Sequence, residues 1–119
     1  MVHIEDVLFH SLGQTGDRYI FGAAVNFNNP DPVEFDCSGL VQWSCGRAGV
    51  DPGVPRRSFE QARHCIKHDK QRTVEEAVDI RGALLFKCMH GNDVPLTIDE
   101  LLTITDRPAR SHVAWSLGA

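Results

Sequence analysis

A cysteine stands at the start of an expected helix, in the run Phe35-Asp36-Cys37-Ser38-Gly39. The unpaired backbone N–H groups and the dipole at a helix N-terminus favour an anion there. A thiol in that place is therefore readily held as the thiolate, which is the nucleophilic form of cysteine. If Cys37 attacks a carbonyl, its own backbone N–H points to the place where the oxyanion forms.

A histidine that could serve such a nucleophile lies far downstream. The segment from Ser111 to Leu117 alternates apolar and polar residues like a strand, and His112 stands near its start. An imidazole beside a thiol can take up its proton and later donate it to a leaving amine. A cysteine at a helix start and a histidine on a later strand are therefore the residues that a thiol hydrolase needs.

Composition limits the kind of protein that carries these residues. The chain of 119 residues is long enough for one domain with its own core. Its hydrophobic content of 42% is typical of a globular protein, and the net charge of −4 with scattered Lys and Arg argues against nucleic-acid binding. No apolar run is long enough for a membrane span. The N-terminal residues lack the pattern of a signal peptide.

The four cysteines could form two disulfides, but the sequence favours free thiols. A chain of this size does not need disulfides, and nothing in it indicates an oxidising compartment. No pair shows the Cys-x-x-Cys spacing of a structural zinc site. Cys45 lies two turns into the expected helix, where it should be buried. The positions are Cys37, Cys45, Cys65 and Cys88.

Hydrophobic periodicity and capping residues predict helices first and strands later. This order indicates an α+β fold, with N-terminal helices packed on a small antiparallel sheet. Ser58 and Thr73 are each followed three residues later by Gln or Glu, which is the pattern of a capping box, and Thr97 can start one more short helix. The expected helices are 3–12, 37 to about 49, 58–65 and short ones after Thr73 and Thr97; the expected strands are the buried 83–86 and 111–117.

Several short motifs in this order resemble those of the NlpC-type cell-wall cysteine peptidases, a papain-like family that cuts bacterial peptidoglycan stem peptides. The resemblance runs from about the first helix to the last residue. It rests on Asp36-Cys37-Ser38-Gly39-Leu40-Val41, Tyr19-Ile20-Phe21-Gly22, Pro55-Arg56-Arg57-Ser58 with Gln61, Arg81-Gly82-Ala83-Leu84-Leu85-Phe86 and His112-Val113-Ala114-Trp115-Ser116-Leu117-Gly118.

The resemblance implies a role for five residues. Cys37 corresponds to the catalytic nucleophile and His112 to the catalytic base. Tyr19 corresponds to a residue whose hydroxyl helps to hold the oxyanion. Asp36 and Ser38 correspond to substrate-binding residues at a free amino end of the stem peptide. This chemistry needs no metal and no cofactor.

The chain departs from the family in two places. The family orients its histidine with a third polar residue on the strand after the histidine strand, whereas this sequence stops at Ala119. One explanation is that 1–119 is a single peptidase domain truncated before its last strands and belongs to a longer parent chain with further domains. The other explanation is that the orienting group comes from elsewhere. Ala83 also stands where the family commonly has aspartate. We therefore expect weak activity for 1–119 by itself.

The sequence thus predicts a thiol protease that cuts peptidoglycan, at the bond that follows D-glutamate. Without a signal peptide it would reach the cell wall as a phage lysin or tail-associated hydrolase, or as a domain of a longer secreted protein. A non-catalytic wall-binding or scaffold module of the same fold is the first alternative. A related amidase or acyltransferase is the second, because both use the same pair of residues.

One other cluster has the spacing of metal ligands. His64 and His68 are four residues apart on the helix expected around them, and Cys65 is adjacent. The charged neighbours Lys67 and Asp69 indicate a solvent-facing surface, so we read this pair as surface residues. Cys88 and His90 are read as core or loop residues.

Overall fold

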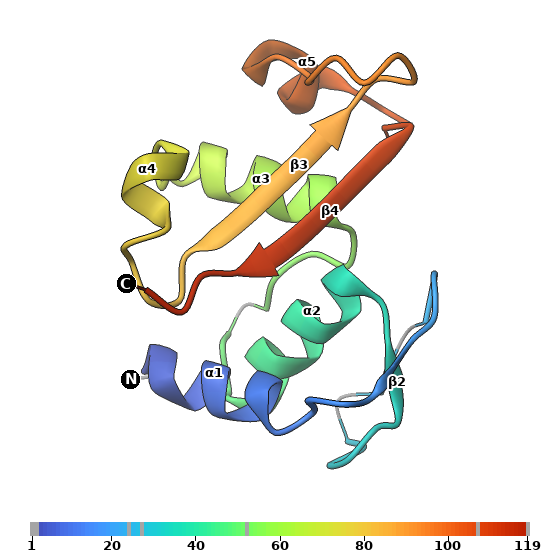
Figure 1. The fold of residues 1–119 in the computed structure, drawn as a ribbon, viewed down its shortest axis with the longest axis vertical. Coiled ribbons are helices and arrows are strands. Elements are labelled where there is room, and N and C mark those ends of the chain that lie inside the picture. The colour runs from blue at the N-terminus through green and yellow to red at the C-terminus, as the bar shows by residue number, and fades with distance from the viewer. Residues whose placement is uncertain (1–2, 24, 27, 52, 107, 119) are drawn as a thin grey trace. The chain divides into compact units, whose positions relative to one another are not determined.

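The computed structural model describes residues 3–23, 25–26, 28–51, 53–106 and 108–118. Contacts between Cα atoms divide the chain into two units, Met1–Arg56 and Arg57–Ala119. The units contain the helices and strands labelled in Figure 1. Each unit is described separately.

The first unit consists of two helices and a very short parallel strand pair. Its elements are α1 (Ile4–Leu12), β1 (Arg18–Tyr19), β2 (Glu34–Phe35) and α2 (Cys37–Arg47). The two helices pack together through buried residues, and the hydroxyls of Ser11 and Ser44 are 2.5 Å apart between them. Trp43 is fully buried on α2, and its indole N–H donates to the carbonyl of Asn29 at 3.0 Å. That bond fixes the loop before β2 against the helix.

The second unit is built on one antiparallel strand pair. It contains α3 (Ser58–Lys67), α4 (Val74–Ala77), β3 (Leu84–Met89), α5 (Ile98–Thr103) and β4 (Arg110–Trp115). The register of β3 and β4 runs from Leu84 opposite Trp115 to Met89 opposite Arg110, and α3 runs behind the strands in Figure 1. Its buried core joins these elements through Phe59, Ala62 and Leu101, with Ile66, Phe86, Cys88 and Ile104 packed around them.

The predicted α+β class is confirmed by these helices and strands. Helix α1 begins one residue after its predicted start, and α2 begins at Cys37 as predicted. The capping boxes at Thr73 and Thr97 are both present, each with the reciprocal pair of hydrogen bonds to the glutamate three residues on. No described helix is long and apolar enough to span a membrane.

The capping box predicted at Ser58 is wrong. Arg57 is the N-cap of α3, and it makes no side-chain cap hydrogen bond. Ser58 is instead the first residue of the helix, and its hydroxyl lies 2.6 Å from that of Ser111 on β4. The hydroxyl is buried, so it must find a partner, and a partner on the strand replaces one in its own helix turn.

The strand predicted at 83–86 is present, but it is longer and less buried than expected. It runs from Leu84 to Met89, and its residues are half-buried or exposed. An apolar run suggests a strand covered on both faces. Here the strand lines an open pocket, which explains the remaining exposure.

Candidate active site

Cys37 is the first residue of α2, and the residue before it caps the helix. Asp36 has extended backbone angles, and its Oδ1 accepts a hydrogen bond from the backbone N–H of Gly39 at 2.6 Å. The carbonyl of Asp36 accepts the first helical hydrogen bond, from Leu40. Cys37 is half-buried. The sulfur therefore belongs to the first helical turn, where backbone N–H groups and the helix dipole favour negative charge.

Tyr19 lies beside this cysteine. Strand β1 pairs in parallel with β2, which places Tyr19 opposite Phe35, two residues before Cys37. Burial, the neighbouring charge of Cys37 and a hydrogen bond with its side chain raise the pKa of Tyr19. A raised pKa keeps the phenol protonated through neutral and mildly alkaline pH, so its hydroxyl can donate a hydrogen bond at this site.

Arg56 joins three parts of the first unit at the helix start. Its Nη1 donates to Asp36 Oδ1 at 3.1 Å and to the Ser38 hydroxyl at 2.9 Å. Its Nη2 donates to Asp36 Oδ2 at 2.8 Å and to the carbonyl of Ala23 at 2.7 Å. The planar guanidinium thus binds the carboxylate with two parallel hydrogen bonds and also fixes the loop after β1.

The guanidinium compensates a buried charge next to the cysteine. Asp36 is buried, with a side chain 10% exposed, and is adjacent to Cys37 in sequence. A buried carboxylate without a cation beside it is strongly unfavourable. Arg56 neutralises it while leaving its N-cap bond to Gly39 intact. Sequence reasoning gave Arg56 no role, although it lies in one of the family-like motifs.

Gly39 is required by the close packing of this site. A Cβ atom at position 39 would lie 2.7 Å from Asp36 Oδ1 and 2.9 Å from the carbonyl oxygen of Ala23. Both distances are shorter than van der Waals contact, and both oxygens are fixed by hydrogen bonds to Arg56. The glycine of the Asp-Cys-Ser-Gly run therefore lets the helix start approach the loop after β1.

The structure thus brings four of the predicted residues together in the first unit: Cys37, Tyr19, Asp36 and Ser38. His112 belongs to the second unit, where it is exposed on β4 directly opposite Lys87 on β3. Within the part of the chain that the structure describes, no hydrogen-bond partner orients its imidazole. The pairing of Cys37 with His112 accordingly stays a prediction.

The other three cysteines differ from Cys37 in their surroundings. All four thiols are free. Cys45 is buried on α2, as predicted, and burial raises its pKa to about 11. Burial also raises the pKa of Cys65 and of Cys88. At neutral pH these three thiols are therefore held in the unreactive protonated form.

Two further groups of residues were considered as possible sites in the sequence: His64 with His68, and Cys88 with His90. The rings of His64 and His68 lie 4.3 Å apart, with His68 exposed. Among the described residues there is no group of three or more His, Cys, Asp or Glu side chains that could hold a metal ion. His90 forms an ion pair with Glu100 at 2.8 Å, and Cys88 packs against the core of the second unit.

Comparison with known proteins gives one relative over part of the chain. No family model and no solved structure matches the sequence. Over 82 residues the chain is 35% identical to the bifunctional muramidase/DL-endopeptidase CwlT of Bacillus subtilis. The match covers 69% of this chain and 21% of CwlT, so the matched segment spans about a fifth of that protein.

The role of Arg56 can be tested by removing its charge. Arg56→Met leaves the buried Asp36 carboxylate without its cation, and we expect the free energy of unfolding to fall by about 3 kcal/mol. Arg57→Met is the matched control, because Arg57 is exposed, and it should change the free energy by less than about 0.5 kcal/mol. Urea unfolding of both variants measures the difference. Equal effects would contradict the role given to Arg56.

The packing of Gly39 gives a second prediction. Gly39→Ala forces a methyl group against two fixed oxygens, and we expect it to destabilise the protein by about 2 kcal/mol. In Gly53→Ala the new Cβ would lie 3.9 Å from the carbonyl oxygen of Val50, an ordinary van der Waals distance, so this control should unfold like the original protein. The same denaturant titration compares the two. An unchanged midpoint for Gly39→Ala would show that the loop after β1 is free to move.

Proposed function

We propose that this chain is a thiol hydrolase that cuts peptide bonds in bacterial peptidoglycan stem peptides. The observation that carries the proposal is the position of Cys37, at the first residue of α2 and hydrogen-bonded to Tyr19. A helix N-terminus favours the thiolate, and the phenol supplies a hydrogen-bond donor beside it. Together they provide two of the three parts that acyl transfer from a peptide requires, and His112 would supply the third.

The composition of the site also supports one of the two activities in the name of the relative over the other. CwlT is described as both a muramidase and a DL-endopeptidase. Glycoside hydrolysis ordinarily uses two carboxyl groups, one as acid and one as base or nucleophile. The carboxylate next to Cys37 is that of Asp36, and Arg56 already binds both of its oxygens. Thiol chemistry on a peptide bond therefore fits these residues better.

In the proposed reaction His112 takes the proton from the sulfur of Cys37. The thiolate attacks the peptide carbonyl carbon, and the resulting oxyanion accepts hydrogen bonds from the Cys37 N–H and the Tyr19 hydroxyl. When the C–N bond breaks, the imidazolium gives its proton to the leaving amine, and the acyl group stays on sulfur as a thioester. Water then attacks the thioester with His112 as base, which releases the carboxylic acid and restores the thiol.

Substrate selection would use the polar residues next to the nucleophile. We propose that a free amino end of the stem peptide lies near Asp36 and Ser38, and that the bond following D-glutamate is cut. The side chains of both residues are already held in place by Arg56, so the amino group would join a preformed charged cluster. The site of action would be the cell wall, reached by phage delivery or as part of a longer secreted protein.

One observation favours a second candidate function. His112 is exposed, and in the described part of the chain nothing hydrogen-bonds to its ring. An unoriented imidazole is a poor base, because it can take the wrong tautomer or turn away from the thiol. A non-catalytic wall-binding module would have this property. Binding to purified peptidoglycan without release of peptides would identify it.

The first prediction from this proposal concerns thiol reactivity. With iodoacetamide at pH 8, Cys37 should be labelled before Cys45, Cys65 and Cys88. With a pKa of about 11, only about one Cys45 in a thousand is a thiolate at that pH. Mass spectrometry of digested protein follows each cysteine. We expect the difference between the four labelling rates to come from the native fold. Labelling of the protein unfolded in urea should therefore make the four rates similar. Equal rates in the folded protein would contradict an accessible, reactive Cys37.

The second prediction concerns activity on soluble stem peptides. Cys37→Ala and His112→Ala should each abolish cleavage, and Tyr19→Phe should lower kcat about 100-fold by removing one oxyanion donor. The controls are Cys65→Ala and His68→Ala, which change the same residue types away from α2 and β4 and should keep full activity. Chromatography of the released peptides measures the rates. Cleavage that survives Cys37→Ala would exclude the thiol mechanism.

A further inference from the structure

The second unit contains an apolar pocket that the proposed reaction does not use. Its volume is about 600 Å³. Strand β3 forms its floor, while α3, α4 and α5 contribute its walls. We call it the β3 pocket and define it by the lining residues Cys65, Ile66, Val74, Phe86, Cys88 and Leu101. Sites that enclose small ligands commonly have volumes of about 300–1,000 Å³.

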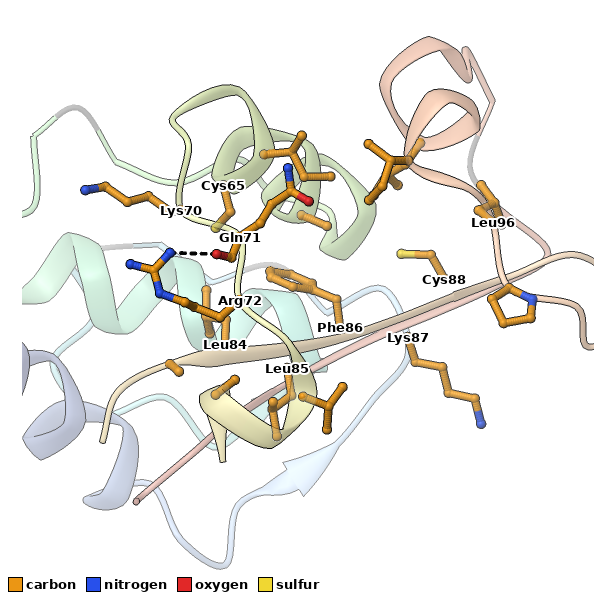
Figure 2. Close-up of a pocket in the computed structure, with 18 of the residues that line it drawn as sticks. Cys65, Lys70, Gln71, Arg72, Leu84, Leu85, Phe86, Lys87, Cys88 and Leu96 are labelled. Atoms are coloured by element: carbon orange, nitrogen blue, oxygen red, sulfur yellow. Dashed lines mark hydrogen bonds between the residues drawn. The ribbon is translucent and has the colours of Figure 1, made fainter. Parts of the chain in front are cut away.

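The side chains of β3 alternate around this pocket. In Figure 2, Phe86 and Cys88 point to the side of the strand where α3 lies, whereas Lys87 points to the opposite side. Phe86 and Cys88 also pack against the buried core of the unit. The pocket is therefore bounded by apolar side chains along the length of the strand, and Lys87 adds a positive charge to its lining.

The charged side chains at the pocket are of one sign. Lys70 and Arg72 line it from the exposed segment between α3 and α4, Lys87 lines it from β3, and no aspartate or glutamate is among its described lining residues. Arg72 donates to the carbonyl of Gln71 at 2.6 Å. Hydrogen bonds from Thr73 lower the pKa of the nearby Glu76, and the charge of Arg72 contributes less. Lys70 forms no ion pair within the described residues. The positive charge at the pocket is local, because the protein as a whole has a net charge of −4.

We propose that the β3 pocket binds a single-chain amphiphile, with its apolar chain along Phe86 and Cys88 and its anionic head group at Lys70 and Arg72. When the apolar chain of the ligand binds, apolar surface of both the ligand and the pocket is removed from water. The anionic head group contacts two cationic side chains while it stays close to solvent. This binding is independent of the proposed peptidase reaction, because none of the residues in that mechanism lines the pocket.

The alternatives fit the lining less well. A purely apolar ligand would not use the two cations, and a cationic amphiphile would be repelled by them. An acidic protein segment would share the charge preference, but a stable protein interface commonly buries about 800 Å² on each partner, more surface than this one pocket offers. The experiments below distinguish these ligands from an anionic amphiphile.

The location of the ligand can be tested with the cysteines of the protein itself. Monomeric dodecanoate, kept below its micelle concentration, should slow the iodoacetamide labelling of Cys65 and Cys88 at least fivefold at pH 9. The labelling of Cys37, which lies in the first unit, should not change. Dodecyltrimethylammonium, with the same chain and opposite charge, should protect neither pocket cysteine. Equal protection by both detergents, or equal slowing of Cys37, would overturn the proposal.

The charge requirement can be tested by calorimetry with dodecanoate. The double variant Lys70→Glu, Arg72→Glu should weaken binding at least tenfold. Lys67→Glu, at the exposed end of α3 and outside the lining, should change the affinity less than threefold. Val74→Asp should also weaken binding; Val74 is 67% exposed and is the first residue of a capped helix, where aspartate is favourable, so the fold should persist.

Unfolding midpoints of all variants establish that each is folded when its affinity is measured. Unchanged dodecanoate affinity in the double variant would overturn the proposed position of the head group. Failure of dodecanoate to bind, together with protection of Cys65 and Cys88 by an acidic apolar peptide, would overturn the proposal in favour of a protein partner.

Discussion

The carboxylate of Asp36 is the constraint on which the first unit depends. One of its oxygens caps α2 through the N–H of Gly39, and both bind the guanidinium of Arg56. Arg56 in turn holds the carbonyl of Ala23 and the hydroxyl of Ser38. A single buried charge therefore fixes the start of the helix, the loop after β1 and the segment before α3. Removing either charge would leave the other buried without its partner, which costs far more than the pair contributes by itself.

This arrangement reconciles two opposing electrostatic demands. A helix N-terminus stabilises an anion, so both the capping carboxylate and the sulfur of Cys37 benefit from it. Arg56 balances the charge of the carboxylate, because it donates to both oxygens of Asp36. Burial raises the pKa of Tyr19, and the charges of Cys37 and Asp36 raise it further. The phenol consequently stays a hydrogen-bond donor at neutral pH.

The strand pair of the second unit separates two chemical environments. Because side chains alternate along a strand, the face of β3 with Phe86 and Cys88 packs toward α3, and the other face carries Lys87 (Figure 2). His112 is directly opposite Lys87, so the two side chains share a face. Lys87 lines the β3 pocket, whereas His112 is not among the described lining residues. This is why the amphiphile site and the peptidase proposal can be tested separately.

Features that depend on neighbours in sequence were determined by the sequence alone. The start of α2 at Cys37, the capping boxes at Thr73 and Thr97 and the burial of Cys45 follow from periodicity and from bonds over three or four residues. Tertiary structure decided what requires distant partners. Arg56 reaches Asp36 across 20 positions and Ala23 across 33, and Ser58 bonds to Ser111 across 53 instead of capping its helix. The partial exposure of β3 was likewise decided by the pocket that it lines, because a strand's sequence carries its apolar pattern but not what packs against each face.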